Sequence, residues 1–275
     1  MAIEASDFEY LVGLIGERSG IIIEANKEYL IEARMAPILR SAEFEDISTL
    51  VASLRTKPKG PLADEVVDAM TTNETSWFRD RHPFDALKSQ VIPELIERNE
   101  EKQKFQIWCG AASSGQEPYT IGMTILEHFP QLKDWGVKII ATDLSTTVLE
   151  QATSGKYSQI EMNRGLPASL LTKYFVRDGT SWVVNDELRS LIDFRPLNLI
   201  ERFPVMPQAD LVFLRNVLIY FDVETKNKIL EGVRKQMEPH AYLFLGGAET
   251  TINVHDGFER LSIGKAAAYK KKEDR

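Results

Sequence analysis

Short apolar segments alternate with amphipathic segments along the chain after about residue 104. Apolar runs bounded by turn residues are typical of buried strands, whereas apolar positions that recur every three to four residues are typical of helices. Strands are expected at 105–109, 137–143, 192–197, 210–214, 241–246 and near 263–270, and helices at about 117–128, 145–153 and 223–237. This alternation predicts an α/β fold, a Rossmann-like doubly wound domain with a mostly parallel sheet and helices on both faces.

The first 70 residues carry a different pattern. Apolar residues such as Phe8, Leu11 and Ile15 recur at helical spacing, and Gly20 is suited to close that helix. Further helices are expected at 26–40, 48–54 and 62–70. We expect no strand here, and therefore an all-helical N-terminal domain at 1–70 that acts as a docking or lid element.

We interpret residues 71–88 as a linker that contributes to a site, followed by a second domain at 89–275. Trp77 and Phe78 are unusual in a linker, because connecting segments seldom carry adjacent large aromatic residues. They are expected either to pack into a core or to line a site.

The same region contains signals for helix ends. Thr72 or Asn73 is expected to cap a helix, because short polar side chains accept hydrogen bonds from the first helical N–H groups. A helix is expected from Pro83 to about Glu101, with a kink or break at Pro93.

Residues 155–195 interrupt the alternation of strands and helices. A helix is expected near 167–174, followed by two short strands around a turn at Asp178–Gly179. We interpret this segment as a small β insertion on the sheet.

The stretch from Phe105 to Tyr119 reads as a strand, a turn of small residues and the start of a helix. Small residues from Gly110 to Gly115 leave the backbone accessible, and such turns hold nucleotide-like ligands in doubly wound sheets. Asp143 ends the next strand, where a carboxylate can bind a ribose diol. A G-x-G-x-x-G sequence is missing, so an ordinary strand–helix turn without a ligand is the alternative.

Other polar residues follow the predicted strands. The carboxyl ends of parallel strands meet at one edge of a sheet, and ligands bind there. We therefore expect Glu117, Asp143, Asn198, Arg215 and Asn216 to gather at that edge. Each of them alone is as consistent with a turn or cap residue.

Composition narrows the class of protein. The net charge of −8 argues against general nucleic-acid binding, and no apolar run approaches the length of a membrane span. Cys109 is the one cysteine, so no internal disulfide forms, and a cytoplasmic location is expected. The four histidines have no metal-ligand spacing, and no metal is expected. Without an exposed apolar seam, a monomer is expected.

Taken together, several blocks resemble those of the chemotaxis receptor methyltransferase family (CheR). The similar blocks are TTNETSWFR, WCGAASSGQEPY, ATDL, RPLNL and LRNVLIYFD, in the order found in that family, and the likeness covers nearly the whole chain. The resemblance implies an S-adenosylmethionine-dependent methyltransferase domain behind the helical domain. It implies methyl transfer to glutamate side chains of chemoreceptors, with S-adenosylhomocysteine as the product and the receptors' methylation helices as partners.

The resemblance also implies residue roles. It places cofactor contacts at Asn73, Thr75, Arg79, Glu117, Asp143, Asn198, Leu199, Arg215 and Asn216. As catalytic groups we expect Arg79, which would orient the cofactor's carboxylate or the incoming glutamate, and Tyr220, which would hold the nucleophile by a hydrogen bond. Receptor docking falls at Lys27, Arg34 and Arg40, which are expected to form a basic stripe on one helix. From the pattern alone, a solvated charged face is the alternative.

The sequence departs from the family's pattern at several positions. Trp77 stands where a phenylalanine is usual, and Gln116 where the first of two acids is usual. The segment from Gly246 to Thr250 lacks the family's histidine and serine, so no role is assigned there. The turn in YFVRDGTSWVV is shorter than in members that bind a receptor's C-terminal pentapeptide, so we expect independence from that tether.

Two other functions stay open at this point. The first is an S-adenosylmethionine enzyme that acts on a small molecule or on another protein. The second is a non-catalytic sensor that binds the cofactor or its product and signals through the helical domain.

Overall fold

The protein is described here by a computed structural model, which covers residues 3–272. The chain divides into two compact units, each with its own interior. One comprises Met1–Thr72 and Tyr220–Thr225, and the other Asn73–Ile219 and Lys226–Arg275. We refer to them as the helical unit and the sheet unit.

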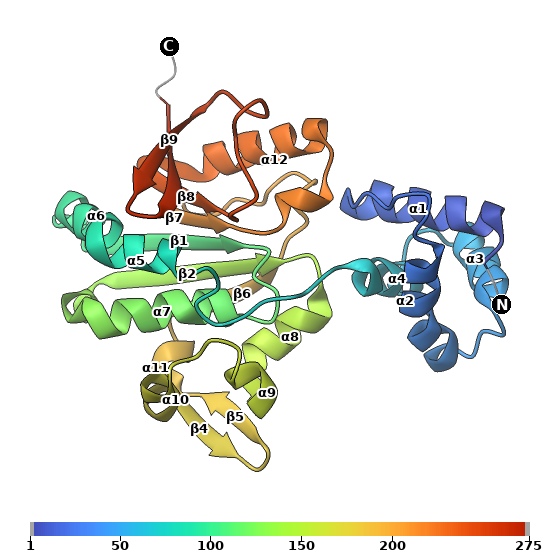
Figure 1. The fold of residues 1–275 in the computed structure, drawn as a ribbon, viewed down its shortest axis with the longest axis horizontal. Helices are drawn as coiled ribbons and strands as arrows, with labels where there is room; N and C mark the ends of the chain where they lie inside the picture. Colours follow the sequence, from blue (N-terminus) through green and yellow to red (C-terminus); the bar gives the residue numbers. More distant parts are fainter. Residues whose placement is uncertain (1–2, 273–275) are drawn as a thin grey trace. The chain divides into compact units, whose positions relative to one another are not determined.

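Four helices make up most of the helical unit (Figure 1): α1 (Ala5–Ser19), α2 (Glu28–Ser41), α3 (Ile47–Thr56) and α4 (Pro61–Met70). Gly20 ends α1 in the left-handed conformation at φ 73°, which glycine adopts without steric cost. Asp46 caps α3 by accepting from Thr49 N–H, and Pro61 opens α4. The described residues before Thr72 contain no strand, which confirms the expected all-helical region.

A seven-stranded sheet forms the centre of the sheet unit (Figure 1), in the order β6-β2-β1-β7-β8-β10-β9. Its strands are β1 (Lys104–Gly110), β2 (Gly136–Asp143), β6 (Ile192–Pro196), β7 (Ala209–Leu214), β8 (Met237–Leu245), β9 (Phe258–Ile263) and β10 (Ala266–Lys271). The neighbours from β6 to β8 are parallel, and β10 is antiparallel to both β8 and β9. The chain order reverses between β1 and β7, and ligands bind at such a switch point.

Helices connect the parallel strands: α7 (Gln116–His128), α8 (Thr146–Ser154) and α12 (Val223–Gln236), with short 3₁₀ turns at Pro130–Asp134 and Leu218–Tyr220. The crossover from β1 to β2 and the crossover from β7 to β8 run in opposite directions along the sheet. Since such crossovers are right-handed, α7 and α12 cover opposite faces. The doubly wound, mostly parallel α/β fold is therefore confirmed.

The helix before β1 is continuous rather than broken at Pro93. It comprises α5 (His82–Ala86), a π-helical turn (Leu87–Val91) and α6 (Ile92–Asn99). Pro93 lies in the first turn of α6, and the π-helical turn precedes it. The expected helix cap at Thr72 or Asn73 is wrong, because residues 72–76 form neither helix nor strand.

The insertion carries its own three-stranded sheet, in the order β3-β5-β4. Its elements are β3 (Lys156–Ser158), α9 (Gln159–Met162), α10 (Ala168–Tyr174), β4 (Phe175–Asp178), β5 (Ser181–Val184) and α11 (Asp186–Arg189). The hairpin of β4 and β5 was expected, whereas β3 was not. The strand expected near 263–270 corresponds to β10, whereas β9, which joins it through a turn at Gly264 with φ 58°, was not expected.

Trp77 packs into a core instead of lining the site. Its side chain is 1% exposed, and its ring meets Tyr157 and Phe175 edge to face, with centroids 5.0 and 5.3 Å apart. The Trp77 indole N–H also donates to the Glu161 carbonyl oxygen at 3.1 Å. The linker is therefore anchored in the core of the insertion.

Candidate active site at the carboxyl edge of the sheet

The turn between β1 and α7 follows an unusual backbone path. Ala111, Ser113 and Gly115 all have positive φ, at 55°, 51° and 93°. At Gly110 an added Cβ would lie 2.8 Å from Leu214 Cδ1, so a larger residue there would require the Leu214 side chain to move. The result is a compact turn at the switch point of the sheet.

Glu117 lies in the first turn of α7 and pairs with Arg215 at the end of β7. Glu117 Oε2 is 2.6 Å from Arg215 Nη1, and the two side chains are 12% and 1% exposed. Burial raises the pKa of the Glu117 carboxyl above its usual value, and the guanidinium of Arg215 acts in the opposite direction. Glu117 Oε1 lies 3.9 Å from the Cys109 sulfur, which can donate to it. That oxygen can accept hydrogen bonds from a ligand.

Arg215 also holds the linker in place. Its Nη2 donates to the Arg79 carbonyl oxygen at 3.1 Å and to Asp80 Oδ2 at 2.6 Å. The linker is strained here, because Phe78, Asp80 and Arg81 have φ values of 49°, 65° and 48°. One guanidinium therefore connects the start of α7 to the segment that carries Arg79.

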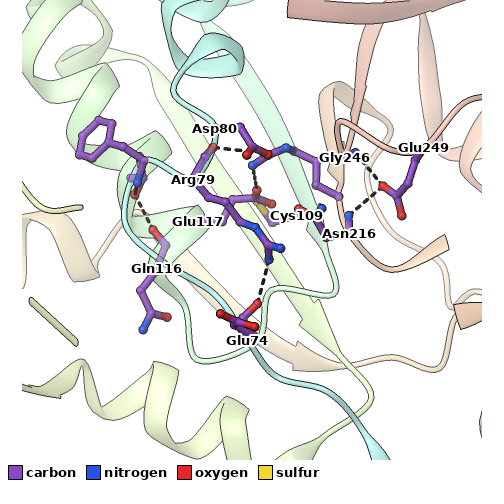
Figure 2. Close-up of polar contacts among 12 residues, drawn as sticks. Glu74, Arg79, Asp80, Cys109, Gln116, Glu117, Asn216, Gly246 and Glu249 are labelled. Carbon is purple, nitrogen blue, oxygen red and sulfur yellow. Dashed lines mark hydrogen bonds and ion pairs between the residues drawn. The ribbon is translucent and has the colours of Figure 1, made fainter. Parts of the chain in front are cut away.

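Arg79 lies within this strained segment and is half-buried. Its Nη1 donates to the Glu74 carbonyl oxygen at 2.9 Å, which fixes one arm of the guanidinium (Figure 2). Arg79 also acts electrostatically on Glu117, where it opposes the rise in pKa caused by burial. The structure thus places Arg79 near Glu117 in the charged group at this edge.

Asp143, at the tip of β2, is held by backbone donors instead. Its Oδ2 accepts from Ser113 N–H at 2.8 Å, and its Oδ1 accepts from Ser145 N–H at 2.9 Å. The side chain is 7% exposed. The contact with Ser113 fixes the β1–α7 turn against β2, so Asp143 and Glu117 flank the same turn.

Glu249 received no role from the sequence, yet it joins two loops at this edge (Figure 2). Its carboxylate accepts from Asn216 N–H at 2.8 Å, Gly246 N–H at 2.6 Å and Ile219 N–H at 3.3 Å. Asn216 has φ 58°, and a Cβ on Gly246 would lie 2.7 Å from Glu249 Oε2. Glu249 therefore sets the path of the loop that follows Arg215.

The remaining expected cofactor residues occupy different parts of this region. The Asn73 carbonyl oxygen accepts from the Ser113 hydroxyl at 2.8 Å, and Thr75 is half-buried in the same linker. Asn198 and Leu199 follow β6, beside the β2 tip, where Leu197 N–H donates to the Asp143 carbonyl oxygen at 2.9 Å. Four strand ends thus contribute: β1, β2, β6 and β7.

Tyr220 and the expected docking residues belong to the helical unit. Lys27 precedes α2 instead of lying within it, so the expectation of three basic residues on one helix is wrong for this position. Arg34 is half-buried, and its Nη1 donates to the carbonyl oxygens of Ala69 and Thr71, each at 3.2 Å. Arg40 is exposed in the last turn of α2.

The described residues, 3–272, contain neither a candidate metal site nor a candidate membrane span. No group of three or more histidine, cysteine, aspartate or glutamate side chains is arranged to hold a metal ion there. Within the same residues, no helix has the length and apolar character needed to cross a bilayer.

Comparison with known proteins gives matches along nearly the whole chain. A family profile described as "CheR methyltransferase, all-alpha domain" matches residues 6–71, and one described as "CheR methyltransferase, SAM binding domain" matches residues 73–267. Chemotaxis protein methyltransferase 1 of Pseudomonas aeruginosa is 40% identical over 99% of this chain and 100% of its own length. Chemotaxis protein methyltransferase Cher2 of Pseudomonas putida is 39% identical over 97% of this chain and 98% of its own.

Proposed function

The chain belongs to the CheR family of chemotaxis methyltransferases, and from that premise we propose that it methylates glutamate side chains of chemoreceptors for adaptation in bacterial chemotaxis. One observation carries the proposal beyond the family. Two carboxylates, Glu117 and Asp143, flank the β1–α7 turn, and Arg79 lies within electrostatic reach of Glu117. This arrangement suits a cofactor with a cationic end and a diol.

S-adenosylmethionine, when bound, supplies a methyl group on a positively charged sulfur. The donor set at the sheet edge fits this cofactor. Asp143 is positioned by backbone N–H groups to accept from the ribose hydroxyls, and Glu117 Oε1 is open to the ammonium of the methionine end. The further contacts proposed are those of Asn73, Thr75, Asn198, Leu199, Arg215 and Asn216. The Arg215 guanidinium is already bound to Glu117 and Asp80, so its side chain acts by holding Glu117.

Arg79 is the proposed orienting residue for a carboxylate. A guanidinium presents its donors in a planar fork that matches a carboxylate, and one arm of Arg79 is fixed by Glu74. The bond from Arg215 to the Arg79 carbonyl oxygen helps to hold this strained segment in place. Arg79 therefore positions either the carboxylate of the cofactor or that of the incoming glutamate.

The chemical step needs no general base, because a glutamate carboxylate is ionised at neutral pH. Catalysis then comes from holding the carboxylate oxygen in line with the bond that breaks, and from excluding water around it. Tyr220, on the 3₁₀ turn after β7, is proposed to hold the nucleophile through its hydroxyl. No proton has to leave the reacting carboxylate.

For the protein substrate, Lys27, Arg34 and Arg40 are the proposed docking residues on the receptor's methylation helix. Exposed Arg40 is suited to meet an acidic partner directly. Arg34 also ties α2 to the end of α4, so its substitution is expected to affect folding as well as docking.

Independence from a receptor pentapeptide is a separate part of the proposal. The hairpin of β4 and β5 pairs Asp178 with Ser181, so only Gly179 and Thr180 form its loop. Calorimetry with such a pentapeptide is expected to show no binding, and tight binding would contradict this part alone.

Methyl transfer from labelled S-adenosylmethionine to a receptor cytoplasmic fragment tests the function. The label is expected on glutamate side chains of the fragment, as base-labile methyl ester. A fragment with its methylated glutamates changed to alanine is the control, and it should accept no label. Label on a small molecule or another protein would favour a different methyltransferase, and cofactor binding without any transfer would favour a sensor.

A further inference from the structure

A cavity with charged residues in its lining lies beside the proposed cofactor site, within the sheet unit. Its volume is about 340 Å³, and the loop after β8, the turn between β9 and β10 and the start of α5 form its walls. Arg215 and Asp80 line it too. The cavity therefore shares a wall with the ion-pair network that holds Glu117.

The charges that line this cavity do not cancel. Arg260 on β9 and Lys265 in the following turn are exposed, and neither makes an ion pair within residues 3–272. The two acids of the lining are already satisfied. Asp80 pairs with Arg215, and Glu249 accepts three backbone N–H groups. An anion is therefore the ligand that these two cations favour.

We propose that this cavity binds a second carboxylate of the protein substrate, on the same receptor segment as the methylated glutamate. The inference rests on the proposed function, since that function brings an acidic protein segment to this edge. A whole-chain net charge of −8 repels such a segment, and a local pair of cations beside the transfer site opposes that repulsion. Arg260 and Lys265 thereby select glutamates that have an acidic neighbour.

The test compares substrates and variants together. The enzymes are wild type, Arg260→Gln, Lys265→Gln, the double variant, and Lys102→Gln as a control. Lys102 is exposed, lies just before β1 at the opposite edge of the sheet, and its change removes the same charge. The substrates are a receptor cytoplasmic fragment and the same fragment with the acids flanking its methylated glutamate changed to glutamine. Labelled methyl transfer gives kcat and KM for each pair.

On the acidic fragment, the double variant is expected to raise KM about three- to tenfold, with kcat within about twofold of wild type. On the fragment without flanking acids, the same variant should match wild type. Lys102→Gln should match wild type on both. Equal KM on the acidic fragment, or an equal loss on both fragments, would overturn the inference.

The proposed function has a separate readout in this experiment. Wild-type transfer to the acidic fragment reports on the function, whereas the ratio of variant to wild type reports on the cavity. No transfer by the wild-type enzyme would overturn the function and this inference with it. Transfer with unchanged ratios would overturn the inference alone.

Discussion

Glu117 and Asp143 flank one turn but are held in different ways. Asp143 accepts from two backbone N–H groups. Glu117 is instead paired with the guanidinium of Arg215, which lies 98 residues away in the chain. Backbone donors follow from the path of the chain, and no side-chain substitution removes them. The Glu117 side of the site therefore depends on one distant side chain, whereas the Asp143 side depends on the path of the backbone.

The largest expected effect comes from removing Arg215. Arg215→Met would leave Glu117 buried without its counter-charge and would free Asp80 and the strained linker. Loss of one partner of a buried pair costs about 3–5 kcal/mol, and we expect the free energy of unfolding in urea to fall by that amount. Adding Glu117→Gln should restore part of it. A loss below about 1 kcal/mol in the single variant would contradict the dependence on Arg215.

Substitution of Arg79 tests whether the charged group around Glu117 and Arg215 serves catalysis. Arg79→Ala is expected to lower turnover about 100-fold, as removal of a preorganised electrostatic group does. The neighbouring Arg81 is the matched control, because it is exposed and shares the strained segment. Arg81→Ala should keep near wild-type turnover. Equal turnover in both variants would remove Arg79 from the catalytic machinery.

On the other side of the turn, Asp143→Ala should weaken cofactor binding. The loss of buried hydrogen bonds is expected to cost about 1–3 kcal/mol in calorimetric titrations with S-adenosylmethionine. Asp193→Ala is the control, because Asp193 is on the neighbouring strand and pairs with Arg195 at the surface. Affinity that is the same in both variants would exclude Asp143 from the cofactor site.

The smallest effect concerns pH. Folding raises the pKa of Glu117 above its ordinary value of 4.5. At a pH between the unfolded-state and folded-state pKa, the folded protein therefore binds more protons than the unfolded protein. The contribution of Glu117 to stability is present below pH 4.5 and declines as pH rises through the folded-state pKa. Relative to wild type, Glu117→Gln should therefore gain unfolding free energy as pH rises from 4.5 to 7. A constant difference would show that the pKa is unchanged by folding.

Periodicity along the chain was enough to predict a mostly parallel sheet, because β1, β2, β7 and β8 are largely buried and apolar. The strand β9 was missed because two charged residues, Glu259 and Arg260, interrupt its apolar pattern. The short β3 was missed because three residues carry no readable period.

Site residues could be predicted where they stand at the carboxyl end of a predicted strand, as Asp143 and Arg215 do. Asp80 and Glu249 were not, because their roles depend on partners 135 and 33 residues away in the chain. No local pattern encodes such pairs. The position of Arg215 at a strand end indicated a site. It did not indicate that the guanidinium is already paired with Glu117 and Asp80 and is therefore not available to a ligand.

The proposed roles of Asp143 at the ribose and of Glu117 at the amino-acid end can be tested by comparing two ligands. 5′-Methylthioadenosine has the ribose of S-adenosylmethionine but lacks its amino-acid end. Asp143→Ala should weaken the binding of both ligands by the same factor, and Glu117→Gln should weaken S-adenosylmethionine alone. Equal weakening of both ligands by Glu117→Gln, or no effect of Asp143→Ala on methylthioadenosine, would contradict the assignment of the two ends of the site.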